Sequence, residues 1–203
     1  MVFMSNRRIL AATMLLSPVA AHAHHAMDGR TPATFAEGLL SGLGHPVIGL
    51  DHLAAVAAIG LIASLSPHRV KLIAAFFVSM VCGVGLHVAR LDLPLSEAGI
   101  ALSLVAFGWL LIRASVTPAV PAALVAAAAG ALHGYAYGES IVGAEATPLG
   151  AYLLGLLVVQ AAIALGVGSG ARVVYRAFPV RGERISLASG ALVVVLGIAL
   201  LRL

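Results

Sequence analysis

Long apolar stretches dominate this chain and limit what it can fold into. Six of them follow one another, at residues 47–65, 71–89, 95–112, 119–138, 149–174 and 185–201. Each has roughly the 17–25 residues that an α-helix needs to cross the hydrocarbon core of a bilayer. The chain is 61% hydrophobic and only 10% charged, whereas a soluble domain does not need so much apolar material. We therefore predict an all-α polytopic membrane protein, with a six-helix transmembrane bundle over residues 45–203.

The first residues have the three parts of a cleavable secretory signal peptide, residues 1–23. Arg7 and Arg8 supply the charged start, residues 9–16 the apolar core, and Ala21-His22-Ala23 a small-x-small cleavage site. We predict that this segment is removed from the mature chain. The mature N-terminus would then lie in the periplasm, and the protein in a bacterial inner membrane.

The segment that follows, residues 24–44, is polar and precedes the first span. We expect a short interfacial helix over residues 34–43. His24 and His25 would begin the mature chain, where an amine beside imidazoles can chelate a divalent cation. They either capture metal ions before the pore or belong to a disordered tail, and the sequence leaves both readings open.

Charged residues are distributed unequally between the turns. With the mature N-terminus outside, the cytoplasmic turns hold most of the basic residues, Arg69, Lys71, Arg113, Arg172, Arg176, Arg181 and Arg184. This follows the positive-inside rule. Most acidic residues fall at the outer side, which either attracts cations or simply solvates short loops. The basic residues form no patch with interleaved aromatics, so we expect the lipid bilayer and no nucleic acid as a partner.

One polar stretch, His45-Pro46-Val47-Ile48-Gly49-Leu50-Asp51-His52, opens the first span. An Asp inside a membrane helix costs about 2.5–3.5 kcal/mol on insertion scales, which favours a functional reading. We expect Pro46 in the first helical turn and His45 near the cap. The two histidines return to nearly one face but stand about 10 Å apart along a straight helix. Either a distortion near Gly49 shortens this gap, or the histidines mark successive stations.

Four polar groups on three spans are expected at similar depth. At 1.5 Å per residue, Asp51 and His52 lie about 9–10 Å below the outer end of their helix, His87 about 4–5 Å and His133 about 8 Å. Imidazole and carboxylate together suit divalent Ni²⁺, Co²⁺, Zn²⁺ or Cu²⁺. A lone histidine in an apolar helix is usually structural, so the expected convergence is what favours a metal site.

Glycines at four-residue spacing predict close approach of helices. Gly130, Gly134 and Gly138 form one such series, and Gly166 with Gly170 another. Membrane bundles use small residues in this way because lipid provides no hydrophobic force between helices.

The motif His45-Pro46-x-x-Gly49-x-Asp51-His52, with the later His133-Gly134-Tyr135-Ala136-Tyr137-Gly138-Glu139, resembles the HupE/UreJ family of nickel and cobalt permeases. The resemblance covers the mature chain. It implies an inner-membrane permease that admits Ni²⁺ or Co²⁺ and serves nickel or cobalt enzyme maturation. By position it implies metal contacts for His45, Asp51, His52, His133 and Glu139. Glu145 is the other candidate for the acidic partner of His133.

We therefore expect a secondary transporter or facilitator and not an enzyme. Two other functions stay open. One is a non-transporting assembly factor that delivers metal to a partner enzyme. The other is a haem-binding electron carrier, with two of His52, His87 and His133 as axial ligands.

Overall fold

The structure, a computed structural model, describes residues 30–113 and 118–202. The predicted signal peptide, residues 1–23, and the pair His24 and His25 lie outside these residues. The predictions made for them therefore stay predictions.

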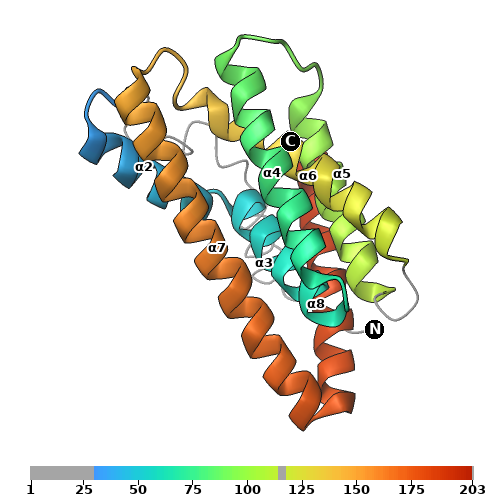
Figure 1. Cartoon of the computed structure of the whole chain (residues 1–203). Helices are drawn as coiled ribbons and strands as arrows, with labels where there is room; N and C mark the ends of the chain where they lie inside the picture. The colour runs from blue at the N-terminus through green and yellow to red at the C-terminus, as the bar shows by residue number, and fades with distance from the viewer. Residues whose placement is uncertain (1–29, 114–117, 203) are drawn as a thin grey trace, which may run out of the picture.

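Within the described ranges the chain is all helical, as predicted, and contains no strand. Its seven helices are α2 (Phe35–Ile48), α3 (Leu50–Leu65), α4 (Arg69–Val88), α5 (Ser96–Ile112), α6 (Ala119–Glu139), α7 (Ala146–Ala177) and α8 (Pro179–Leu200). Figure 1 shows α7 as the longest, with α2 lying across its upper part and α3 running down beside it. The bounds of α4 to α6 lie within two residues of the predicted spans, because apolar length determines them. α7 is three residues longer at each end than predicted, and α8 begins at Pro179, six residues before the predicted start.

The polar stretch folds differently from the prediction. α2 and α3 are separate helices that meet at Gly49 with a bend of 80°. His45 and Pro46 lie in the last turn of α2 and not in the first turn of a span. Pro46 lacks an N–H and crowds only the turn before it, so α2 continues past it and ends at Ile48, where the backbone of Gly49 turns to an extended conformation. The predicted start of the short helix is confirmed, because Thr34 caps α2.

Four helices, α4, α6, α7 and α8, are each long and apolar enough to cross a membrane, and the bent pair α2–α3 makes up to five. The chain is therefore a membrane protein with several spans. α5 is apolar but has only 17 residues, which is the short end of the spanning range. The count of six transmembrane helices stays a prediction.

Glycines bring the helices into backbone contact. A Cβ on Gly134 of α6 would lie 2.0 Å from the backbone oxygen of Met80 in α4. Gly130 meets the backbone of Phe76 in the same way, and Gly138 meets the His87 side chain of α4, so the predicted close approach of this series is confirmed. The prediction for Gly166 and Gly170 is wrong, because both face open space. The α3–α7 contact is made two residues away from each, at Gly168, which lies against Gly60.

Two ends of the bundle can be distinguished by their charges. The histidine end comprises the α2–α3 break, the α4–α5 and α6–α7 connections and the exposed acids Asp92, Glu97, Glu139 and Glu145. The arginine end comprises the α3–α4 connection, the end of α5 and the α7–α8 junction. It carries Arg69, Lys71, Arg113, Arg172, Arg176, Arg181 and Arg184. An apolar core that includes Phe76 and Phe107 separates the two ends.

Candidate metal centre

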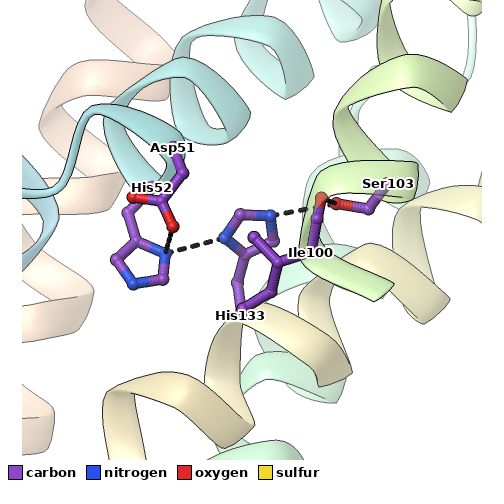
Figure 2. A network of polar contacts seen from close by, with 5 residues as sticks. All are labelled: Asp51, His52, Ile100, Ser103 and His133. Atoms are coloured by element: carbon purple, nitrogen blue, oxygen red, sulfur yellow. Dashed lines mark hydrogen bonds and ion pairs between the residues drawn. The ribbon is translucent and has the colours of Figure 1, made fainter. Parts of the chain in front are cut away.

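Three polar side chains from α3 and α6 meet near the histidine end. His52 Nδ1 lies 2.8 Å from His133 Nδ1, and Asp51 Oδ2 lies 3.8 Å from His52 Nδ1. Figure 2 shows the His133 ring between His52 on one side and Ser103 of α5 on the other. His52 is 4% exposed and His133 is fully buried. The prediction that Asp51, His52 and His133 converge is confirmed.

Ser103 determines which nitrogens carry protons. Its hydroxyl donates to the Ile100 carbonyl at 2.7 Å, so its oxygen is left to accept the Nε2–H of His133 at 3.0 Å. A neutral His133 then has its lone pair on Nδ1. This nitrogen accepts the Nδ1–H of His52 at 2.8 Å. One proton is therefore shared between two nitrogens that are both potential metal ligands.

His45 belongs to a second set of polar contacts next to the first. Its Nδ1 lies 3.0 Å from both Ser140 Oγ and Tyr152 Oη. The Tyr152 and Ser140 hydroxyls each reach the Tyr137 carbonyl, at 2.8 and 3.1 Å. Because these hydroxyls donate to a carbonyl, their oxygens accept from His45 Nδ1–H. The lone pair of a neutral His45 is therefore on Nε2.

The break at Gly49 joins the two sets. The ring centroids of His45 and His52 are 5.6 Å apart, much closer than the axial distance in a straight helix. Of the two alternatives drawn from the sequence, the distortion near Gly49 is the one observed. Glycine is required there for space, since a Cβ would lie 2.9 Å from both Asp51 Oδ1 and His52 Cδ2. The Tyr137 ring also packs against both histidines.

The Asp51 carboxylate has unused binding capacity. Its Oδ1 is buried and has no hydrogen-bond partner among the described residues. The side chain as a whole is 18% exposed. A buried carboxylate oxygen normally accepts hydrogen bonds or binds a cation, so this oxygen can serve as a ligand.

His87 is not brought into this centre, contrary to the predicted convergence. Its Nδ1 bonds the Tyr135 carbonyl at 2.7 Å, and its ring stacks on that tyrosine at 4.3 Å. Gly138, at the end of α6, packs against it. Glu139 and Glu145 are exposed at the histidine end, whereas His133 is fully buried. Helix rise gives the position of a side chain along its helix but does not say which way it faces. The depth predicted for Asp51 and His52 assumed a straight helix from His45, whereas both lie in the first turn of α3.

The centre is closed in this structure. No three His, Cys, Asp or Glu side chains within residues 30–113 and 118–202 are arranged to hold a metal ion. Two imidazoles on one tetrahedral ion, each about 2.0–2.1 Å from it, have nitrogens roughly 3.3 Å apart. The two Nδ1 atoms are 2.8 Å apart with a proton between them. For both Nδ1 atoms to bind one ion, the two rings would have to move apart by roughly 0.5 Å. The proton on His52 would also have to move from Nδ1 to Nε2.

Four functional contacts were missed from the sequence. Ser103 is a single serine in an apolar span, and nothing in the sequence around Tyr152 indicates a contact with a histidine. Tyr137 belongs to the second motif, but the sequence analysis gave it no contact with the histidines. Ser140 directly follows that motif. A hydroxyl in a predicted membrane helix was the one available signal, because such a group needs a partner.

Comparison with known proteins shows the family of this chain. Residues 11–200 match the family described as HupE / UreJ protein. The chain is 34% identical over 193 residues to "Protein HupE" of Rhizobium leguminosarum bv. viciae, covering 91% of this chain and 95% of that protein. No solved structure matches significantly. With its two histidine motifs brought together at one end of a helical membrane bundle, the chain belongs to the HupE/UreJ family.

Proposed function

We propose that this protein is an inner-membrane permease that moves a divalent transition-metal ion, Ni²⁺ or Co²⁺, from the periplasm to the cytoplasm. The observation that carries the proposal is the buried group of His52, His133 and Asp51, with His45 beside it. Ionisable side chains inside a membrane bundle are costly, and they characteristically mark ion pathways. The nickel and cobalt chemistry comes from the family resemblance and is compatible with the ligand types.

The closed geometry suits a transported ion better than a resident one. Conduction requires a site that binds an ion strongly enough to admit it and weakly enough to release it. Here the ion competes with the His52–His133 hydrogen bond, so each release restores a satisfied pair. The acids at the histidine end would concentrate cations before entry. Inward movement would gain about 2.3 kcal/mol per unit charge per 100 mV of membrane potential.

The geometry does not favour a haem-binding electron carrier. An iron ligated axially by His52 and His133 would stand between their nitrogens, with the porphyrin plane separating the rings. The 2.8 Å contact leaves no space for that plane. The third ring proposed for this role, His87, instead bonds the Tyr135 carbonyl.

The test uses the purified full chain in liposomes with a metal-sensitive dye inside, and Ni²⁺, Co²⁺, Zn²⁺ or Cu²⁺ added outside. Asp51→Asn and His52→Gln keep the side-chain size and are expected to reduce Ni²⁺ and Co²⁺ entry at least 100-fold. His68→Gln is the matched control, because this imidazole lies exposed at the arginine end. Entry at the wild-type rate in both site variants would refute the permease. Metal binding without entry in the wild type would support the non-transporting assembly factor.

A further inference from the structure

Gln160 of α7 is a buried polar side chain that the metal centre does not use. It is 0% exposed, and neither its Oε1 nor its Nε2 has a hydrogen-bond partner among the described residues. Burying an amide in a membrane bundle without partners costs free energy, and natural proteins rarely leave both atoms unpaired. A leucine would pack there without this cost, so the amide calls for a functional explanation.

The contacts of α7 place Gln160 just inward of the centre. One turn before it, Leu156 packs on Gly42 of α2, and one turn after it, Ala164 packs on Gly60 of α3. α3 and α7 run in the same direction, since both begin at the histidine end and their later residues, Ser64 and Arg172, line one pocket at the arginine end. Gln160 therefore lies level with the residue one turn before Gly60, which is Val56. That level is one turn, about 6 Å, further from the histidine end than His52.

The same side of α7 leads on to a pocket at the arginine end. Ala164 and Gly168 line one wall of this pocket, and Gly60 and Ser64 of α3 line another. Its volume is about 220 Å³ and it is partly open. Gln160 thus lies between the candidate metal centre and this partly open pocket at the opposite end, along the α3–α7 contact.

We propose that Gln160 is an internal polar station that takes the ion from the histidine–aspartate centre and passes it toward the arginine-end pocket. Its amide oxygen can ligate a divalent cation, and its NH₂ group can donate to a water carried by the ion. Because the amide is neutral, it binds a cation weakly, and a site on a conducting path must bind weakly enough to release the ion. Arg69 and Arg172 also line the pocket and repel a dication, so the pocket is an exit and not a resting place.

This inference rests on the proposed function, and the experiment separates the two. Gln160→Met replaces the amide with an apolar side chain of similar length. We expect this variant to keep the wild-type Co²⁺ absorption spectrum and Co²⁺ affinity of the histidine–aspartate centre. Its melting temperature should equal or exceed that of the wild type. Co²⁺ entry into liposomes should fall at least tenfold in maximal rate. Gln160→Glu retains an oxygen ligand and should recover part of the rate, with half-saturation at lower Co²⁺.

Val158→Met is the matched control, because Val158 lies on the same helix two residues away and is 53% exposed on the outside of the bundle. It should transport like the wild type. Wild-type entry in Gln160→Met would overturn the station. Loss of Co²⁺ binding in Gln160→Met would also overturn it, by showing that the residue acts through the centre. A wild-type protein that binds no Co²⁺ would instead overturn the permease assignment, and the station with it.

Discussion

Ser103→Ala tests whether the proton arrangement of the centre controls metal affinity. In the wild type, Ser103 Oγ accepts the Nε2–H of His133, which keeps the Nδ1 lone pair toward His52. Without that acceptor, the metal-free variant can shift the His133 proton to Nδ1 and donate it to His52. In the metal-bound variant this shift is not possible, because His133 Nδ1 binds the metal. The proton of His133 then stays on Nε2, buried and without an acceptor.

The magnitude follows from this asymmetry. An unpaired buried donor costs about 1–3 kcal/mol, and here the cost falls on the metal-bound state alone. Co²⁺ affinity should therefore fall by roughly 5- to 150-fold. This range agrees with the general cost of removing a hydrogen-bond partner of a ligating histidine, about 10- to 100-fold.

The assay is a Co²⁺ titration of the detergent-solubilised chain, followed by the visible absorption of the bound ion. Ser79→Ala is the matched control, because the Ser79 hydroxyl also donates to carbonyls within its own helix, at 2.7 and 3.0 Å, and contacts no histidine. An affinity in Ser103→Ala within twofold of both the wild type and this control would refute the tautomer argument.

Three further predictions concern packing and the remaining histidines. Gly134→Val should lower the melting temperature strongly, because a Cβ would overlap a backbone carbonyl of α4 at 2.0 Å. Gly166→Val is the control and should leave the melting temperature unchanged, since no described atom lies within 4 Å of a Cβ there. Equal melting curves for the two variants would contradict the helix contact. His87→Gln should leave the Co²⁺ spectrum of the centre unchanged, since this ring bonds a carbonyl outside it; an altered spectrum would show that it ligates. Tyr152→Phe removes one of the two acceptors of His45 Nδ1–H and should weaken Co²⁺ binding a few-fold in the same titration, while unchanged binding would show that this hydrogen bond does not support the site.

Much of the fold was predictable because it depends on local composition. Apolar length marked α4 to α8, and the glycine series in α6 indicated a close helix contact that the structure contains. These features follow from the bilayer acting as solvent, which selects long apolar helices and small residues at their contacts. The glycines of α7 show the limit, since spacing alone chose Gly166 and Gly170 when the contact is made at Gly168.

For the candidate site, the sequence by itself determined which residues are costly to bury in a membrane bundle, since side-chain chemistry is a local property. Only the tertiary structure decided which of them meet. The 80° break at Gly49 brings His45 to His52, and the rotation of α4 turns His87 to a carbonyl of α6 instead. Bend and rotation depend on contacts between helices far apart in the chain, and no spacing within one span encodes them.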